Sequence, residues 1–586
     1  MCSIIGFVSS KQASPSIVQG LRRMEYRGYD SAGIAVLEGK KIHVRKGVGK
    51  VAEVNDMLGM DELPGYVAVG HTRWATHGGV TEKNAHPHLS SSGKLAIVHN
   101  GIVDNYRVLK ESLLKEGFSF RSETDSEVIA NLLEKAFAET RSIEESMMRV
   151  VTQIDGKYAF VAIFDDGTLA AARFHEPLII GIGENGYYVA SDVLGFAGVT
   201  DKVVYVDNGE FAAIDSEGIS IFDFQGNPVP HGVTRVAEEF GVIGKGKYVH
   251  FTLKEIFEQP QTIAMAAKLT ESELKEVSRL LTEASRVYVM GCGTSYHAAL
   301  LGCRLLSEYA QVNATPVLAS EAKFFPTKYD SKTVLIALSQ SGETADVLEA
   351  VEIGLEKGAK VVSLVNVATS TLARISTLSI GLRCGPEIGV AATKSFTSQL
   401  ATFYAIASHL SGGRVPSDLG GVSKGISELL VKQTHLREVA RRMKGASDIY
   451  VLGTGPHYCV ALEGALKIKE LAYVHAEALP GGELKHGPLA LLDPSVYVIV
   501  VNPSDATYVD MLASAHEAKS RGAKIIGISD KPSDVYDEWV GLPKLDPSLL
   551  PLVEVVPFQA LAYYLAVERN ADPDYPRNLA KSVTVK

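Results

Sequence analysis

The chain has 586 residues, and at roughly 100–200 residues per domain this length predicts about three or four domains. It carries 58 basic and 68 acidic residues, a net charge of −10, and this acidic balance argues against binding nucleic acid or an anionic membrane over the whole surface. The apolar fraction of 46% and the charged fraction of 22% are those of an ordinary globular protein, so they exclude disordered, fibrous and collagen-like chains.

The cysteines and the apolar stretches indicate a protein of a reducing, cytoplasmic compartment. The five cysteines are odd in number and widely spread, with no CxxC pair and no metal-ligand spacing, so we expect neither a disulfide framework nor a metal site. The N-terminal segment lacks the basic and apolar regions of a secretory signal. The longest uncharged stretch, residues 395–411, is interrupted by Ser, Thr, Gln and His, which argues against a membrane span.

Residues 2–228 are predicted to form an α+β layered domain, because short period-2 or apolar strands alternate with turns and only a few helices. One amphipathic helix is expected over residues 125–139, after an acidic opening rich in Ser and Thr. In residues 236–247 (VAEEFGVIGKGK) charge and glycine replace the apolar pattern, so we place a linker over residues 229–250. The strands are expected at residues 3–8, 66–70, 95–99, 158–164 and 187–190.

After the linker the sequence predicts two copies of one doubly wound α/β domain, over residues 276–415 and 438–575, followed by a tail of residues 576–586. Buried-type strands alternate with helical stretches, which indicates βαβ units and parallel sheets. VYVMGCGTSYHAAL (287–300) aligns with IYVLGTGPHYCVAL (449–462), and a repeat this long indicates a duplicated domain rather than a solenoid. Strands are expected at residues 286–290, 333–338 and 360–365, and again at 449–452, 496–501 and 524–528.

The first copy carries two turns rich in Gly, Ser and Thr, Gly291–Ser295 and Ser339–Thr344, each between a strand and a helix. At the carboxyl ends of parallel strands, a helix N-terminus and hydroxyl groups can bind an anion. Each turn taken alone is equally compatible with a simple helix N-cap. Because two occur at neighbouring strand ends, we interpret them as a phosphate monoester site. The second copy has Asn502–Asp505 in the corresponding position, so only one repeat is expected to hold a phosphate.

The second copy instead gathers ionisable residues. Glu463, Lys467 and Glu470 are spaced four and three residues apart, so they share one helix face. His486 follows in the segment GGELKHGP, and Lys581 lies in the tail RNLAKSVTVK. A surface salt-bridge ladder, a loop histidine and a solvated lysine are the plain alternatives. A partly desolvated lysine is, however, what an imine-forming catalyst requires, because the free amine is its reactive form.

The N-terminal half contains the groups of an enzyme that hydrolyses the amide of glutamine. Removal of the initiator Met would make Cys2 the first residue, with an α-amino group of pKa near ~7.7–8.0 as an internal base. A half-buried small side chain is the alternative role for this cysteine. Arg73 suits a carboxylate, and Asp125 suits an ammonium group. The Asn100 side-chain amide and the Gly101 N–H are the two donors that an oxyanion hole needs.

Eleven segments form a set that is more specific than any one of them: LRRMEYRGYDSAG (21–33), HTRWATHG (71–78), NAHPH (84–88), HNG (99–101), SETDSE (122–127), CGTS (292–295), SQSGET (339–344), EIGVAATKSFT (387–397), ALEGALKIKE (461–470), GGELKHGP (481–488) and RNLAKSVTV (577–585). Together they resemble the glutamine–fructose-6-phosphate transaminase (isomerizing) family, the glucosamine-6-phosphate synthases, from end to end. The first five alone would fit any N-terminal-nucleophile amidotransferase, including amidophosphoribosyltransferase. Ser3 departs from the glycine that the family usually has after the nucleophile, which puts the local backbone geometry in question.

For the fold, this resemblance implies an α+β N-terminal-nucleophile amidohydrolase layer domain, a class II glutamine amidotransferase domain, followed by two α/β doubly wound parallel-sheet sugar isomerase domains. It also implies that ammonia released from glutamine crosses an internal channel without mixing with water. The residues that match the family's glutamine-handling positions are Cys2 (nucleophile), Asn100 and Gly101 (oxyanion hole), Arg73 and Asp125 (α-carboxylate and α-amino group), Trp74, Thr76 and His77 (around the substrate), and Arg27 and Trp74 (closing loop and channel gate).

For the sugar half, the resemblance implies that Lys581 forms an imine with C2 of fructose 6-phosphate and that Glu470, assisted by Lys467, moves a proton between C1 and C2. His486 matches a ring-opening histidine that the family takes from the neighbouring subunit, so a homodimer is expected. No metal or organic cofactor is implied. The product would be glucosamine 6-phosphate, formed in the first step of the hexosamine pathway. The matching phosphate and sugar contacts are Thr294, Ser295, Ser339, Gln340, Ser341 and Thr344.

Two rival functions remain open at this level. One is another sugar-phosphate enzyme, such as a deglycase that releases amino groups, against which the complete tail and the GGELKHGP segment argue. The other is a non-catalytic sugar-phosphate sensor attached to a DNA-binding module. The acidic charge and the lack of a basic helix-turn-helix segment argue against a sensor.

Overall fold

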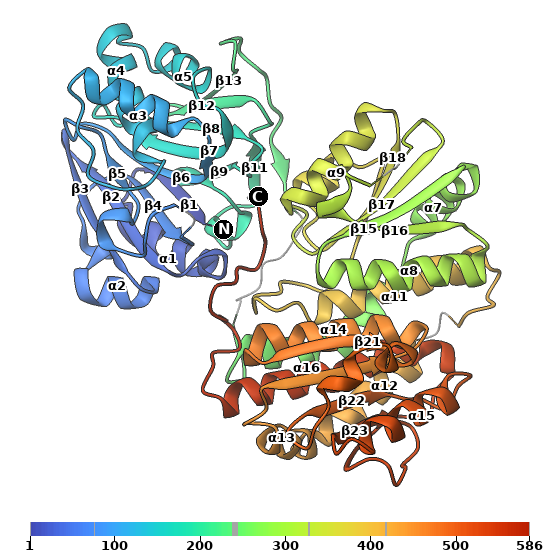
Figure 1. The fold of residues 1–586 in the computed structure, drawn as a ribbon. Coiled ribbons are helices and arrows are strands. Elements are labelled where there is room, and N and C mark those ends of the chain that lie inside the picture. The colour runs from blue at the N-terminus through green and yellow to red at the C-terminus, as the bar shows by residue number, and fades with distance from the viewer. Residues whose placement is uncertain (1, 76, 237–243, 326–327, 417–418, 585–586) are drawn as a thin grey trace. The chain divides into compact units, whose positions relative to one another are not determined.

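The computed structural model describes residues 2–75, 77–236, 244–325, 328–416 and 419–584 (Figure 1). The chain forms two compact units, one of residues 1–243 together with 582–586 and one of residues 244–581. Among the helices of the described ranges, none is both long enough and apolar enough to cross a membrane.

The first unit contains two antiparallel sheets. The eight-stranded sheet has the order β14-β11-β9-β10-β1-β4-β2-β3, and the six-stranded sheet has the order β13-β12-β8-β7-β6-β5. The strands are β1 (Ser3–Ser9), β2 (Ser31–Glu38), β3 (Lys41–Val48), β4 (Val67–Arg73), β5 (His88–Leu89), β6 (Ala96–Val103), β7 (Gly156–Ile163), β8 (Leu169–Phe174), β9 (Ile179–Gly183), β10 (Gly186–Ala190), β11 (Lys202–Tyr205), β12 (Glu210–Ile214), β13 (Ile219–Asp223) and β14 (Thr234–Arg235).

Helices cover the outer faces of this pair of sheets, and β7 shows how the cores are built. Ala159, Val161 and Ile163 lie in the core between the sheets, whereas Tyr158 and Phe160 pack in a second core with the helices. This period of two is what a strand buried on both faces requires. The predicted α+β layered fold is therefore confirmed. The helices are α1 (Ser14–Met24) and α2 (Val51–Leu58), which contact strands of the eight-stranded sheet, and α3 (Tyr106–Lys115), α4 (Glu127–Thr140) and α5 (Ile143–Val151) on the other side.

The segment predicted as a linker is partly structured. β14 pairs with β11 through Lys202 and Arg235, so the first unit extends into residues 229–250. Residues 237–243 lie outside the described part of the chain.

The second unit contains two five-stranded parallel sheets of the same topology, β16-β15-β17-β18-β19 and β21-β20-β22-β23-β24. This confirms the two doubly wound domains. The strands are β15 (Arg286–Gly291), β16 (Ala314–Leu318), β17 (Thr333–Ser339), β18 (Lys360–Val365), β19 (Leu378–Gly381), β20 (Asp448–Gly453), β21 (His475–Pro480), β22 (Tyr497–Val501), β23 (Lys524–Ser529) and β24 (Glu538–Gly541). The helices are α6 (Phe251–Ala266), α7 (Glu271–Glu283), α8 (Thr294–Ala310), α9 (Ala345–Glu356), α10 (Thr371–Ile375), α11 (Lys394–Leu410), α12 (Gly420–Val431), α13 (Gln433–Arg442), α14 (Pro456–Ala472), α15 (Tyr508–Lys519) and α16 (Pro551–Glu568).

The duplication extends to the backbone of the first turn in each repeat. Gly293 before α8 and Gly455 before α14 have φ values of +51° and +62°, which favour glycine. A Cβ on Gly302 would lie 2.5 Å from Phe403, and one on Gly464 would lie 2.5 Å from Phe558, so α8 packs on α11 as α14 packs on α16.

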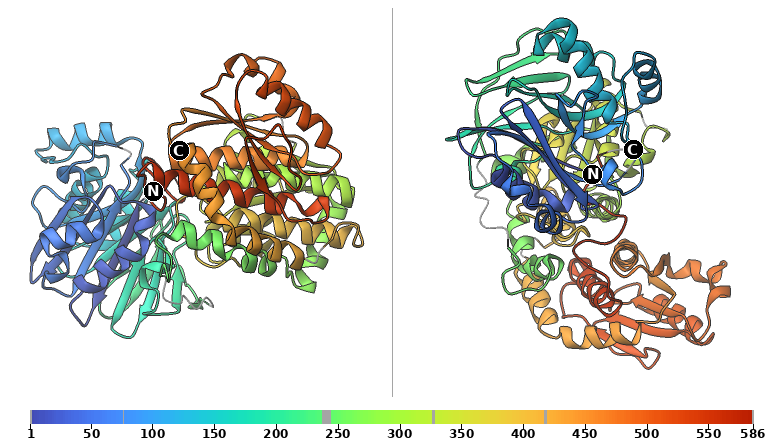
Figure 2. Two further views of the ribbon diagram at one scale, coloured as in Figure 1. Left: turned by 90° about the horizontal axis from the view of Figure 1, so that it is seen from below. Right: turned by 90° about the vertical axis from the view of Figure 1, so that its left-hand side faces the viewer.

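The helices α8 and α14 also contact each other between the two sheets of the second unit (Figures 1 and 2). Buried residues of both repeats form one continuous core there, including Val289 and Ile336 of the first repeat and Val451 and Ile499 of the second. The carboxyl end of β15 and the start of α14 are thereby held in one rigid region.

Candidate functional site

The thiol of Cys2 lies at the start of β1, beside the end of β4. Ser3 pairs with Thr72 in the register of these strands, which brings Cys2 to Trp74. The Trp74 N–H donates to Cys2 Sγ over 3.3 Å, and the thiol lies 3.6 Å from the Trp74 carbonyl. Burial raises the pKa of the Cys2 thiol, an effect that the nearby Arg73 charge opposes. Ser3 takes part in ordinary strand pairing, and its hydroxyl donates to the Met24 carbonyl over 2.8 Å.

The side chain of Asn100 faces Cys2 from β6. Its Nδ2 donates to the Cys2 carbonyl over 3.2 Å. Gly101 follows with φ +103°, and a Cβ there would lie only 2.0 Å from the Lys157 carbonyl, so no other residue fits this backbone. The two residues predicted to supply the oxyanion donors therefore follow each other on β6, and the Asn100 side chain contacts the backbone of Cys2.

Sequence reasoning missed the histidines that support Asn100. His71 Nε2 lies 2.9 Å from the His99 carbonyl and 3.2 Å from Asn100 Oδ1. Because a carbonyl only accepts, Nε2 carries the proton, and this bond orients the Asn100 amide so that its NH₂ faces Cys2. The His86 ring stacks on His71 with centroids 4.1 Å apart, and burial lowers the pKa of His71 to about 3. The HTRWATHG and NAHPH segments contain these histidines, but only the structure shows that His71 and His86 lie together and that His71 contacts Asn100.

The other predicted glutamine contacts are held by local structure. The Arg73 guanidinium donates to the carbonyls of His77, Gly78 and Gly79, so it folds the loop after β4. Asp125 Oδ2 accepts from the Val103 N–H over 2.8 Å. Trp74 and His77 are half-buried, and Thr76 lies outside the described residues.

Arg27 lies apart from these contacts, in an ion pair with Asp192. Its Nη1 is 3.0 Å from Asp192 Oδ2, and the Tyr26 hydroxyl donates to the same oxygen over 2.9 Å. The LRRMEYRGYDSAG segment is therefore tied to the start of the short helix η4 (Val193–Phe196).

The two predicted phosphate turns close the ends of β15 and β17, which are neighbours in the sheet. Ser339 Oγ accepts from the Gly342 N–H over 2.9 Å and lies 2.9 Å from the Thr344 hydroxyl. Gly342 has φ +67°, and a Cβ there would lie 2.0 Å from Ser370 Oγ, which explains this glycine. Gln340 and Ser341 are half-buried at the turn, and Gln399 Nε2 donates to Ser295 Oγ over 2.9 Å.

The charged face of α14 meets the first turn of α8. Lys467 Nζ lies 3.2 Å from Glu463 Oε1 and 2.6 Å from Glu470 Oε2, and it donates to Thr294 Oγ1 over 3.2 Å. The Thr294 hydroxyl donates to Glu463 over 3.0 Å, and His297 Nδ1 lies 2.8 Å from the second oxygen of that carboxylate.

This cluster is not a surface ladder, because the side chains of Glu463 and Lys467 are fully buried. Burial alone would lower the pKa of Lys467, but Glu463 and Glu470 raise it, so the ammonium form is held. Sequence reasoning placed the three residues on one face but missed that Thr294 and His297 complete the cluster.

The tail lysine is buried rather than solvated. Lys581 Nζ donates to Glu387 Oε2 over 2.6 Å and to the Gly389 carbonyl over 2.8 Å, and its side chain is 2% exposed. Burial opposes ionisation of Glu387, but Lys581 holds the pKa of that carboxyl low, at about 2. Glu255 on α6 lies next to it, and burial together with Glu387 raises the pKa of Glu255 to about 8.

His486 stands elsewhere, exposed at the end of the short helix η6 (Gly481–Lys485), where its N–H donates to the Glu483 carbonyl over 3.0 Å. Among the hydrogen bonds and ion pairs of the described residues, none joins His486 or Lys581 to the charges on α14. These two predicted residues therefore make no direct contact of this kind with the cluster.

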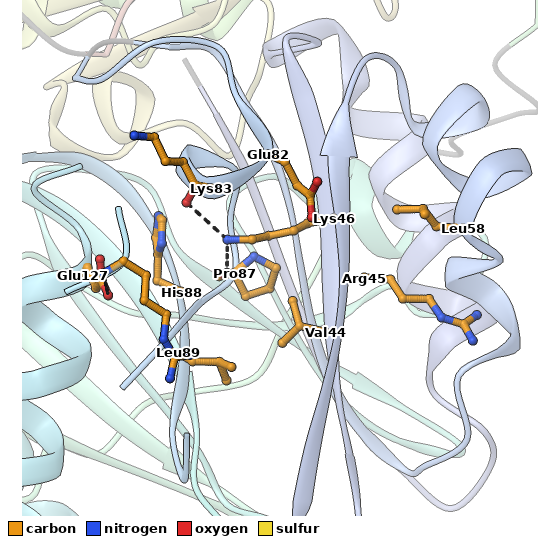
Figure 3. Close-up of a pocket in the computed structure, with 11 residues that line it drawn as sticks. Val44, Arg45, Lys46, Leu58, Glu82, Lys83, Pro87, His88, Leu89 and Glu127 are labelled. Atoms are coloured by element: carbon orange, nitrogen blue, oxygen red, sulfur yellow. Dashed lines mark hydrogen bonds between the residues drawn. The ribbon is translucent and has the colours of Figure 1, made fainter. Parts of the chain in front are cut away.

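A pocket of about 440 Å³ in the first unit contains none of the predicted site residues (Figure 3). Its one deeply placed amine, Lys46 Nζ, points at the carbonyls of Lys83 and Pro87, and burial lowers the pKa of Lys46 to about 8. The pocket is lined by Val44, Arg45, Lys46, Leu58, Glu82, Lys83, Pro87, His88, Leu89, Arg121 and Glu127.

A separate group consists of Asp207, Glu210 and His231, whose possible metal-ligating atoms lie within 4.8 Å of one another. His231 already pairs with Glu210.

Comparison with known families matches both units. A glutamine amidotransferase domain model matches residues 71–197, and a SIS domain model matches residues 280–409 and 443–569. The C-terminal domain of glucosamine-fructose-6-phosphate aminotransferase from Francisella tularensis is 30% identical, with a TM-score of 0.52 over 57% of this chain and all of that one. A tagatose-6-phosphate ketose/aldose isomerase from Escherichia coli shares the fold at 20% identity, with a TM-score of 0.50 over 57% of this chain and 96% of that one.

Curated relatives match over their whole length. The glutamine–fructose-6-phosphate aminotransferases [isomerizing] of Pyrococcus horikoshii and Thermococcus kodakarensis are 43% and 42% identical to this chain, and each alignment covers 100% of both chains. That of Aquifex aeolicus is 39% identical, again over 100% of both chains. The chain therefore belongs to the family of isomerizing glutamine–fructose-6-phosphate aminotransferases.

Proposed function

We propose that this chain converts D-fructose 6-phosphate and L-glutamine to D-glucosamine 6-phosphate and L-glutamate, since its relatives are named as isomerizing glutamine–fructose-6-phosphate aminotransferases. The observation that supports this most is the buried Glu463–Lys467–Glu470 cluster, which contacts Thr294 of a predicted phosphate turn. A sensor needs no buried acid–base cluster at its ligand site, whereas an enzyme that moves a proton does.

In the glutamine half, the Cys2 thiolate attacks the amide carbon and forms a thioester as ammonia leaves. The free α-amine of Cys2 takes the thiol proton and delivers it to the leaving nitrogen, which requires removal of the initiator Met. Asn100 Nδ2 and the Gly101 N–H stabilise the oxyanion. Water then hydrolyses the thioester to glutamate.

Arg73 and Asp125 would hold the α-carboxylate and the α-amino group of glutamine, with Trp74, Thr76 and His77 around them. Because the Arg73 guanidinium already donates to the carbonyls of residues 77–79, binding of a carboxylate would tighten or replace these bonds. Arg27 and Trp74 are assigned to closure over glutamine and to the gate through which ammonia passes to the sugar.

In the sugar half, Thr294, Ser295, Ser339, Gln340, Ser341 and Thr344 bind the phosphate and hydroxyl groups of the open sugar. Lys581 forms an imine at C2 with loss of water, and ammonia then replaces the lysine at that carbon. Glu470 removes a proton from C1 and returns it to C2, while the proton of the C1 hydroxyl group passes to the nitrogen, which gives the 2-amino aldose. Lys467 assists by holding the Glu470 carboxylate in place, with its Nζ 2.6 Å from Glu470 Oε2.

Lys581 is paired with Glu387 in the structure, so imine formation requires that this pair opens and that the ammonium loses a proton. Glu387 accepts a hydrogen bond from the Lys581 ammonium, so it lies where it can control the release of Lys581 from the ion pair. The mechanism calls for no metal or organic cofactor, and we place the reaction in the cytoplasm at the entry to amino-sugar biosynthesis.

We further propose that the working form is a homodimer, in which the exposed His486 opens the sugar ring at the site of the neighbouring subunit. Mixed dimers of His486→Ala and Lys581→Ala chains should then regain part of the activity that each variant lacks alone. Absence of complementation would mean that each subunit works by itself.

Product analysis tests the proposed function. The purified full-length chain is incubated with glutamine and fructose 6-phosphate, and mass spectrometry should detect glucosamine 6-phosphate and glutamate in equal amounts. Glutamate without amino sugar would show that the acceptor is wrong, and release of ammonia from glucosamine 6-phosphate as the favoured direction would indicate a deglycase.

A further inference from the structure

The first turn of α14 is tied to two other elements by a buried ion triad that the proposed mechanism does not use. His457 is the second residue of α14, and its side chain is fully buried. Its Nδ1 lies 2.8 Å from Glu554 Oε2 on α16, and its Nε2 lies 2.8 Å from Asp505 Oδ2 in the loop after β22. Both ring nitrogens face carboxylates, which stabilise a doubly hydrogen-bonded cation.

The same place in the first repeat is occupied by a neutral pair. Ser295 stands seven residues before Gly302, as His457 stands seven before Gly464, and each glycine packs on an equivalent phenylalanine. Gln399 stands four residues before Phe403, as Glu554 stands four before Phe558. The hydrogen bond from Gln399 to Ser295 therefore corresponds to the contact between Glu554 and His457.

The third member of the triad stands where the first repeat has its phosphate turn. β22 is the counterpart of β17, because each pairs with the first strand of its repeat. Asp505 follows β22 as residues 340–344 follow β17, and it also accepts from the N–H and the hydroxyl of Thr507. The second repeat thus carries its own carboxylates at the N-terminus of α14, where a negative charge complements the helix dipole.

We propose that His457 is a positioning residue for the sugar reaction, which anchors the first turn of α14 to α16 and to the loop after β22. This rests on the proposed function, because that function assigns the acid–base work to residues of α14. Glu470 lies 13 residues beyond His457 on the same helix, about 20 Å at a rise of 1.5 Å per residue. A change of tilt at the first turn therefore moves the carboxylate, and a misplacement of about 1 Å can cost ~100-fold in rate.

The contact between α14 and α16 depends on the positive charge of His457, because this charge pairs with the buried Glu554 carboxylate. The Glu554 side chain is fully buried, Oε2 faces His457, and Oε1 has no hydrogen-bond partner within the described parts of the chain. Without the imidazolium, this carboxylate would be left buried and unpaired, and α14 and α16 would have to separate or admit water.

The test uses the full-length chain and three variants, His457→Ser, His457→Ser/Glu554→Gln and the exposed control Lys469→Gln on the same helix. The rate of glucosamine 6-phosphate formation, the KM for fructose 6-phosphate and the rate of glutamine hydrolysis are measured well below the melting temperature. In His457→Ser, kcat for the sugar product should fall at least about tenfold, whereas the sugar KM and the hydrolysis rate should stay within about twofold. A loss of overall stability would lower both activities together.

The double variant copies the Ser–Gln pair of the first repeat and should return kcat to within about threefold of the wild type, because the buried Glu554 charge is removed together with its cation. A double variant as slow as His457→Ser would overturn the anchoring role, and so would an unchanged kcat in His457→Ser. If His457→Ser does not fold, Asp505→Asn replaces it, with an expected fall in kcat of about three- to tenfold at constant KM. An unchanged kcat in Asp505→Asn would then contradict the proposal.

The two proposals fail in different ways. A wild-type chain that forms no glucosamine 6-phosphate contradicts the proposed function. An active wild-type chain with an equally active His457→Ser variant contradicts only the positioning role.

Discussion

The two repeats of the second unit share a backbone, but they carry different chemistry at matching places. In the first repeat, the turns after β15 and β17 present hydroxyl and backbone N–H groups, which suit a phosphate. In the second repeat, His457 and Asp505 occupy the same turns and pair with each other. Ionisable residues instead lie along α14, where they face the first repeat.

This difference shows how a duplicated domain can build one site from two copies. Because α8 and α14 contact each other, the predicted anion-binding turn of one repeat lies beside the proposed acid–base helix of the other. A second phosphate turn would add nothing to such a site. In the second repeat, carboxylates instead contact His457 in the first turn of α14.

The largest expected effect comes from the charge on α14. Lys467→Met leaves the buried Glu463 and the half-buried Glu470 without their cation, so we expect at least a ~1,000-fold loss of glucosamine 6-phosphate formation and about 3–5 kcal/mol of lost stability. Glutamine hydrolysis should continue below the lowered melting temperature. Lys469→Met, an exposed lysine on the same helix, is the control and should change neither quantity. A Lys467→Met variant with normal synthesis would remove α14 from the chemistry.

The next prediction distinguishes the role of the loop after β17 from that of the loop after β22. Ser339→Ala removes the hydroxyl that closes the predicted phosphate turn, so the KM for fructose 6-phosphate should rise about 10- to 100-fold. Ser504→Ala is the matched change in the second repeat, where the hydroxyl donates to Asp530 over 2.8 Å, and it should leave KM unaltered. Steady-state kinetics with varied sugar phosphate measure both. Equal increases in KM would mean that both repeats bind phosphate.

The first repeat should lose stability in acid through Glu387. Its pKa is about 2 beside Lys581, below the ordinary value of 4.5, so the pair contributes stability above pH 4.5 that is lost as the pH falls towards 2. Lys581→Met should therefore be about 2–3 kcal/mol less stable than the wild type at pH 7, with the deficit vanishing near pH 2. Denaturant unfolding of both chains between pH 7 and pH 2 checks this. A deficit that is constant with pH would contradict the ion pair.

The second repeat should lose stability in alkali, in the opposite direction to Glu387, through His457. Burial opposes its protonation, but Glu554 and Asp505 raise the pKa to about 10 from an ordinary 6.5. The stabilisation is therefore complete below pH 6.5 and is lost as the pH rises through 10. Relative to the uncharged His457→Ser/Glu554→Gln pair, the wild type should lose about 3–5 kcal/mol between pH 6.5 and pH 10.5. Parallel stability curves would show that the imidazole is neutral.

The sequence predicted the central strands of both repeats, because they are continuous apolar runs buried on both faces. It did not predict the edge strands β16, β19, β21 and β24, which are short and half-exposed. Edge strands need no long apolar run, since only part of their surface is covered. The two repeats could be aligned from the sequence because the backbone requires glycine at matching positions, Gly293 before α8 and Gly455 before α14.

For the site, residue type and spacing were enough to propose Cys2, Asn100 and the face of α14. They were not enough to find His71, which orients Asn100 from another strand, or Glu387, which holds Lys581 across 194 positions of sequence. The buried triad of His457 was missed for the same reason. Its members lie on three elements, and each one alone has the pattern of an ordinary polar residue.

The most direct test of the whole account is an isotope measurement. The full-length chain is given fructose 6-phosphate and glutamine labelled with ¹⁵N in the amide, in a buffer with excess unlabelled ammonium. The account predicts that nearly all of the glucosamine 6-phosphate carries ¹⁵N, because ammonia made at Cys2 reaches the sugar inside the protein. Amino sugar with unlabelled nitrogen would contradict the coupling of the two halves.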